Sequence, residues 1–167
     1  MQGRVVSVQV GALQKMQLNG KPTVTGIYKQ PVQGPVRVRT LGLEGDHQAD
    51  KRYHGGPNQA VYLYPSEHYP FWRKQFPNAD LPHGGLGENL TTEGFLEDDL
   101  RPGMRLRIGT ALFEVTKRRT PCTKLATRVG SMDVIKEMRS NGRSGYYLAV
   151  IEEGLVEAGD PIVEEPE

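Results

Sequence analysis

Apolar and polar residues alternate along several short stretches of this chain, which is the pattern of strands with one buried face. The first stretch covers residues 4–10, where valines recur at alternate positions. Residues 36–40 alternate valine with arginine, so one face of that strand would be basic. Residues 23–28 and 146–151 are predicted as two further strands, and Asn19-Gly20 marks a turn because both residues tolerate positive φ.

The most regular alternation covers residues 104–108 and 111–116, with Gly109-Thr110 between them, so we predict a hairpin there. Residues 60–64 form a continuous apolar run, which is typical of a strand covered on both faces. A last strand is expected within residues 154–163, around a turn at Gly159-Asp160.

Two stretches have helical patterns. Residues 66–76 form the first, with Ser66 as the cap or, alternatively, with a start at Tyr69 that places Pro70 in the first turn. Residues 131–141 form the second, which begins at a capping Ser131 and ends at Gly142. Strands therefore dominate over two or three short helices. The pattern predicts a mainly β fold, a closed or nearly closed β-barrel, since closure removes exposed strand edges.

Composition narrows the class of protein. A chain of 167 residues fits one domain with one sizeable core, which we expect to span residues 1–167. A net charge of +1 gives no global field that would attract nucleic acid or a membrane surface. The single cysteine excludes an internal disulfide framework, which suits a reducing compartment. No signal-peptide core or bilayer-spanning stretch is present, so we expect a cytoplasmic protein.

That cysteine, Cys122, lies in a basic loop at residues 117–125. Five cations and no acid fall between Glu114 and Asp133: Lys117, Arg118, Arg119, Lys124 and Arg128. Nearby cations favour the thiolate, which is the form that attacks electrophiles and binds metals. Arginine forks can also hold a phosphate. The alternative is an inert core cysteine beside a solvated charged face.

Other site signatures are absent or weak. The chain has neither a phosphate-binding loop nor a dinucleotide fingerprint, and its four histidines lack the paired spacing of zinc ligands. A hydrolase with Cys122 as nucleophile and His54 or His83 as base stays open.

Five short motifs, in this order, resemble the MOSC family, which is named for the C-terminal domain of molybdenum cofactor sulfurases. They are Gly42-Leu43-Glu44-Gly45-Asp46, His54-Gly55-Gly56-Pro57, Gly87-Glu88-Asn89-Leu90, Arg119-Thr120-Pro121-Cys122 and Gly142-Arg143-Ser144-Gly145. The resemblance covers about residues 4–163, is strongest to the small stand-alone bacterial members, and implies a β-barrel.

The resemblance implies a role for each matched residue. Cys122 would be the molybdenum ligand and the catalytic centre, because a soft thiolate suits a metal held by a pterin dithiolene. The cofactor, molybdopterin, would be bound by His54, Gly55, Gly56, Glu88, Asn89, Arg119, Thr120, Lys124 and Arg143. Asp46 would either join them or brace its own turn.

The implied activity is that of a molybdenum-cofactor oxidoreductase that reduces N-hydroxylated compounds. Electrons would come from a separate reductase, because the chain lacks the cysteines of an iron–sulfur cluster. No nucleic acid or membrane partner is expected. Two alternatives share the same cationic thiol: a sulfur carrier with a persulfide on Cys122, and a non-enzymatic carrier of the cofactor.

Overall fold

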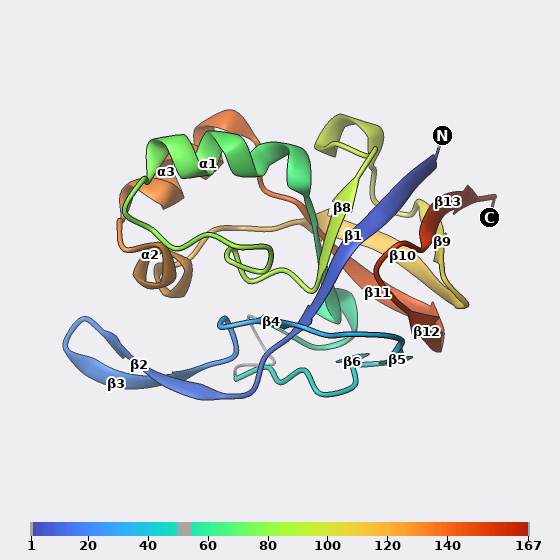
Figure 1. Ribbon diagram of the computed structural model, residues 1–167, viewed down its shortest axis with the longest axis horizontal. Coiled ribbons are helices and arrows are strands. Elements are labelled where there is room, and N and C mark those ends of the chain that lie inside the picture. Colours follow the sequence, from blue (N-terminus) through green and yellow to red (C-terminus); the bar gives the residue numbers. More distant parts are fainter. Residues whose placement is uncertain (1, 50–54, 167) are drawn as a thin grey trace.

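Seven strands close into a barrel in the computed structural model, which describes residues 2–49 and 55–166 (Figure 1). Around the barrel the order is β13 (Pro161–Glu165), β9 (Arg105–Ile108), β10 (Ala111–Arg118), β11 (Tyr146–Glu152), β7 (Val61–Pro65), β8 (Leu90–Glu93) and β1 (Gln2–Val10). Antiparallel pairing of β1 with β13 closes the ring, while β7 and β8 run parallel. The predicted closed, mainly β barrel is therefore confirmed.

Shorter strands extend this barrel. β12 (Gly154–Val156), β5 (Val36–Arg39) and β6 (Gly42–Leu43) form a small sheet, and β4 (Gln30–Pro31) pairs with the end of β1. A two-stranded ribbon of β2 (Gln14–Leu18) and β3 (Lys21–Thr25) extends beyond the barrel in Figure 1.

The ribbon corrects the prediction for residues 23–28, because strand β3 ends at Thr25 and pairs with an unpredicted strand, β2. β2 escaped prediction because its residues are mostly polar and only Met16 is buried. The turn at Asn19-Gly20 is confirmed, with φ of 52° and 76°.

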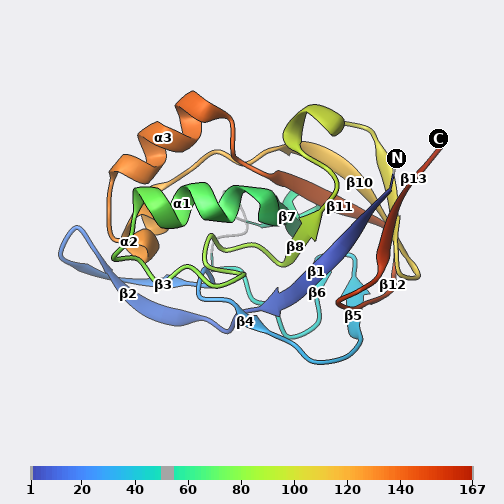
Figure 2. The ribbon, with the colours of Figure 1, turned by 45° about the horizontal axis from the view of Figure 1, so that its top comes forward.

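The helices gather on one side of the barrel, away from the two chain ends (Figure 2). They are α1 (Tyr69–Gln75), α2 (Thr123–Val129) and α3 (Asp133–Asn141). The chain also has 3-10 turns η1 (Pro57–Gln59), η2 (Ser66–His68) and η3 (Glu97–Asp99), of which η3 lies on the side of the chain ends. None of the helices in the described ranges has the length and apolar content to cross a bilayer.

The helix predicted at residues 66–76 begins as an α-helix at Tyr69, with Pro70 in its first turn. Ser66 makes no side-chain capping bond, so that version of the prediction was wrong. α3 ends as predicted, because Gly142 adopts a left-handed φ of 71°.

Strand β7 divides the apolar side chains between two cores. Val61 and Leu63 point into the barrel, whereas Tyr62 and Tyr64 pack with the helices against residues such as Trp72. Since successive side chains of a strand alternate between its faces, a run of buried residues needs a core on each side. This confirms the prediction that residues 60–64 are covered on both faces.

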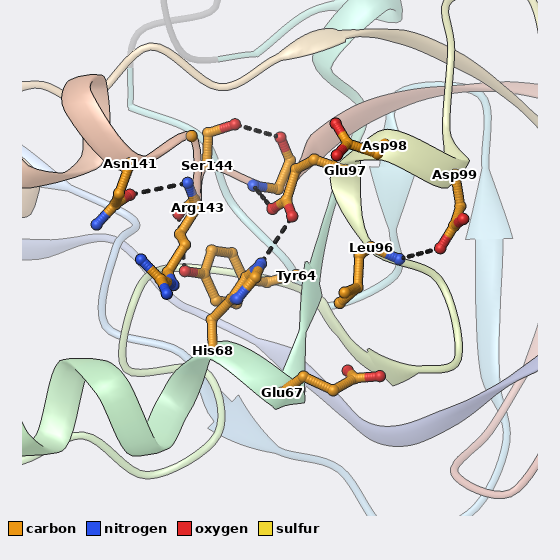
Figure 3. Close-up of polar contacts among 12 residues, drawn as sticks. Tyr64, Glu67, His68, Leu96, Glu97, Asp98, Asp99, Asn141, Arg143 and Ser144 are labelled. Carbon is orange, nitrogen blue, oxygen red and sulfur yellow. Dashed lines mark hydrogen bonds and ion pairs between the residues drawn. The ribbon is translucent and has the colours of Figure 1, made fainter.

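A buried carboxylate ties the loops at one end of the barrel together (Figure 3). Glu97 accepts a hydrogen bond from Gly145 N–H at 2.8 Å and pairs with His68 Nε2 at 2.7 Å. Burial by itself would raise the pKa of Glu97, but the contacts with His68 and Gly145 outweigh burial and hold this pKa below its usual range. Glu97 thus holds the segment before β11 in place.

This contact predicts a pH dependence of stability. Because the folded pKa of Glu97 is depressed, its contribution is complete above the unfolded value of ~4.3 and is lost as pH falls through the folded value. Urea unfolding at neutral and acid pH should therefore show a smaller loss of stability in Glu97→Gln than in the wild type. Glu93→Gln, at an exposed ion pair with Arg4, is the control and should follow the wild type. An identical acid loss in all three proteins would contradict this assignment.

Candidate functional site

A pocket of about 80 Å³ opens beside Cys122, where β10 leaves the barrel and α2 begins. Its walls come from residues within 25–29, 46–49, 59–62, 87–89 and 119–124, together with Tyr147 of β11. Strand ends and loops that are far apart in sequence therefore meet around the thiol.

Cys122 itself is half-buried and precedes the first residue of α2, with an extended backbone at φ −136° and ψ 172°. α2 was not predicted, because its apolar face is short, consisting of Leu125, Ala126 and Val129, and the basic residues around it hide the helical pattern. Gly130, at a φ of 90°, ends that helix. The thiol is thus held at a rigid helix start.

Arg119 brings a buried cation to the pocket. Only 7% of it is exposed, and its guanidinium lies over the Tyr62 ring at 4.8 Å from the centroid. One Nη donates to the carbonyl oxygen of Leu86. The Nε atom is buried and has no hydrogen-bond partner among the described residues. An unpaired buried donor is costly, so this nitrogen is a candidate contact for a bound acceptor.

Two tyrosines complete this side of the pocket. Burial raises the pKa of Tyr62 and of Tyr147 despite the nearby Arg119 cation, so both hydroxyls keep their protons at neutral pH. The Tyr62 hydroxyl donates a hydrogen bond to the carbonyl oxygen of Ser144 at 2.6 Å. Tyr147 packs beside Tyr62 at 5.3 Å between ring centroids.

A buried ion pair forms another part of the pocket wall. Lys29 Nζ lies 2.7 Å from Asp46 Oδ1, and the two side chains are only 7% and 3% exposed. Asp46 also accepts hydrogen bonds from Gly11 N–H at 2.8 Å and from Asn89 Nδ2 at 3.0 Å. Asp46 therefore braces three distant segments rather than its own turn.

The structure brings four of the predicted residues together, since Cys122, Arg119, Lys124 and Asn89 all line the pocket. Lys124 reaches back over the ribbon and donates to the carbonyl oxygen of Val24 at 3.2 Å. Among the described residues, no carboxylate lies within ion-pair distance of Arg119 or Lys124. Within the described part of the chain, their positive charge is therefore not compensated by an acidic side chain.

Glu88 lies outside the pocket wall and is fully buried. Its carboxylate accepts hydrogen bonds from Gly84 N–H at 3.1 Å, Leu86 N–H at 3.2 Å, the Tyr69 hydroxyl at 2.5 Å and the Thr91 hydroxyl at 2.8 Å. With so many donors satisfied, Glu88 holds the loop of residues 84–88 instead of facing a ligand.

Other predicted residues also lie elsewhere. Thr120 is exposed and does not line the pocket, and Arg143 lies in a separate hollow with its guanidinium 4.1 Å from the Phe71 ring centroid. Gly55 is buried and Gly56 lines a neighbouring hollow with Asp46. His54 lies outside the described residues.

His83, the alternative base of a hydrolase, packs against Tyr69 and does not line the pocket. Sequence reasoning missed Lys29, Tyr62 and Tyr147 as pocket residues. No local motif marks them, because only the folded chain brings their strands and loops beside Cys122.

The buried pair predicts an effect on stability. Asp46→Asn should cost about 3 kcal/mol, because it leaves the Lys29 ammonium buried without its counter-charge. Glu44→Gln is a matched control two residues away, in an exposed pair with Arg39 at 3.6 Å, and should cost under ~1 kcal/mol. Denaturant unfolding measures both changes, and equal costs would show that Asp46 is not a buried brace.

Comparisons with known proteins place this architecture in a family. The MOSC domain family matches residues 50–163. Protein YiiM from Escherichia coli is 40% identical over 159 residues, which are 94% of this chain and 70% of that protein. A protein named Reductase from Gibberella moniliformis is 36% identical over 163 residues, which are 96% of this chain but only 29% of that protein.

Among solved structures, YiiM from Geobacillus stearothermophilus superposes with a TM-score of 0.80 at 33% sequence identity. The superposition covers 98% of this chain and 75% of the other. Family match, sequence identity over nearly the whole chain and shared barrel agree, and the chain belongs to the MOSC domain family.

Proposed function

We propose that this protein is an oxidoreductase that holds a molybdenum cofactor beside Cys122 and reduces N-hydroxylated compounds. The observation that carries the proposal is the shared pocket of Cys122 and Arg119, in which a thiol stands beside a buried, incompletely paired cation. Membership of the MOSC family supports a role that involves molybdenum cofactor. The fungal relative named Reductase supports a reductive activity.

The residues present fit such a cofactor. A thiolate is a soft ligand that suits molybdenum already held by a pterin dithiolene. The pterin carries a phosphate, and Arg119 and Lys124 bring two cations that no carboxylate of the described residues neutralises. The unpaired Nε of Arg119 would donate to a phosphate or pterin oxygen. Lys29 would contribute less, since Asp46 already compensates its charge.

When bound, the cofactor would supply the metal and relay two electrons, which together with two protons from solvent convert the N-hydroxyl group to N–H and water. The chain would position the substrate and exclude water. Tyr147 lines the pocket with a hydroxyl that burial keeps protonated, so it would donate a hydrogen bond to the departing oxygen. Tyr62 is less available because its hydroxyl already donates to Ser144. A separate reductase would provide the electrons.

The first test is the molybdenum and pterin content of protein purified from a host that makes the cofactor. Wild-type protein should contain near-stoichiometric metal and pterin, and Cys122→Ser should lose most of the metal because a hydroxyl is a poorer ligand for it than a thiolate. Thr120→Ala is the loop control, since Thr120 is exposed and outside the pocket, and should keep the wild-type content. Absence of metal and pterin from the wild-type protein would contradict the proposal.

The second test measures turnover. Loaded protein with a chemical electron donor should reduce hydroxylated nucleobases, amidoximes or hydroxylamines, and Tyr147→Phe should lower kcat by about 10²-fold if its hydroxyl assists the departing oxygen. Retained cofactor without turnover of any N-hydroxy substrate would favour the carrier alternative. A sulfur adduct on Cys122 in metal-free protein, detected by mass spectrometry, would favour the persulfide alternative.

A further inference from the structure

A second hollow is separate from the Cys122 pocket and shares no lining residue with it. Its volume is about 460 Å³, and its walls are η3, the end of α3 with the loop that follows, His68 and the last residue of β10. The two hollows diverge at the end of β10, where Arg118 lines one and Arg119 lines the other. This follows from the alternation of side chains along an extended chain.

Three arginines line the second hollow: Arg118, Arg139 and Arg143. Arg118 donates to the carbonyl oxygen of Gly142 at 3.2 Å and lies 3.6 Å from Asp98, whose side chain is fully exposed. Within residues 2–49 and 55–166, no carboxylate lies within ion-pair distance of Arg139 or Arg143. The hollow therefore carries cationic groups that the fold does not neutralise.

The open polar groups of this hollow are donors at Asn141 and Arg143 and one exposed carboxylate, Asp98, which lies 3.6 Å from Arg118 (Figure 3). Asn141 Oδ1 accepts the Arg143 backbone N–H at 2.9 Å, but Asn141 Nδ2 is buried and has no partner in the described part of the chain. Both oxygens of Glu97 are engaged, one by His68 and the other by Gly145 N–H. The remaining hydrogen-bonding capacity at Asn141, Arg139 and Arg143 is therefore for acceptors.

We propose that this hollow binds the phosphate group of a small molecule. A phosphate offers several acceptor oxygens and negative charge, which match arginine forks and an unpaired amide N–H. The volume of about 460 Å³ exceeds that of a phosphate alone and leaves room for an attached group. The site is independent of the cofactor proposed at Cys122, because the two hollows have separate linings.

The test is a titration of the full chain with inorganic phosphate at constant ionic strength, followed by amide chemical shifts and calorimetry. Saturable binding should shift amides around residues 96–98 and 139–143. Arg139→Ala should weaken binding about tenfold, since a charged hydrogen bond is lost. Arg139 is exposed, so its removal should not impair folding, and Arg143→Ala serves as the second variant.

Two controls make the result specific. Lys136→Ala removes one positive charge from the same helix, outside the hollow, and should leave phosphate affinity unchanged. Lys124→Ala removes a cation from the Cys122 pocket and should leave the phosphate-dependent amide shifts around residues 96–98 and 139–143 unchanged. Absence of saturable shifts around residues 96–98 and 139–143, loss of those shifts in Lys124→Ala, or equal losses in Arg139→Ala and Lys136→Ala would each overturn the proposal.

A parallel titration with adenosine monophosphate separates the possible sources of the phosphate. Tighter binding than inorganic phosphate, still weakened by Arg139→Ala, would support a nucleotide-like ligand. Equal affinity with the same dependence on Arg139 would support free phosphate.

Discussion

The alternation of side chains across a strand is the constraint on which the rest of this structure depends. β7 and β11 have a core on each side, so each supplies one set of side chains to the barrel and another to the helical layer. Tyr62 and Tyr147 belong to the second set, and this is why they face the Cys122 pocket. The pocket therefore depends on the two strands, β7 and β11, that lie between the barrel core and the helical core. It is not formed by a loop alone.

The packing of two cores against shared strands buries polar groups away from water, where each needs a hydrogen-bond or charge partner. Three acidic residues meet this need in the same manner: Asp46, Glu88 and Glu97 each accept hydrogen bonds from backbone N–H groups and from side chains. Each connects segments that no strand pairing connects. The loops around the pocket are consequently fixed by carboxylates, although the loops contain little regular structure.

Much of the fold could be predicted from the sequence, since the strands with clear alternation, the hairpin at Gly109-Thr110 and the glycine end of α3 depend on local patterns. α2 and β2 could not, because one has too few apolar residues in a basic stretch and the other is mostly polar. For the site, the motif around Cys122 identified Arg119 and Lys124. A motif does not reveal which way a side chain faces, so it could not show that Glu88 and Arg143, expected to bind the cofactor, lie outside the lining of the Cys122 pocket.

The adjacent pair Arg118 and Arg119 has a consequence for how this protein can change. Register shifts in the pairing of β10 with β11, one of them between Val115 and Lys117, influence which of the two arginines faces the Cys122 pocket. A single-residue insertion or deletion in this stretch would exchange their directions, and it would alter both hollows in one step. A substitution can change the lining of one hollow without the other, whereas a change of chain length here alters both. The length of this strand end should therefore be the least variable feature of the region.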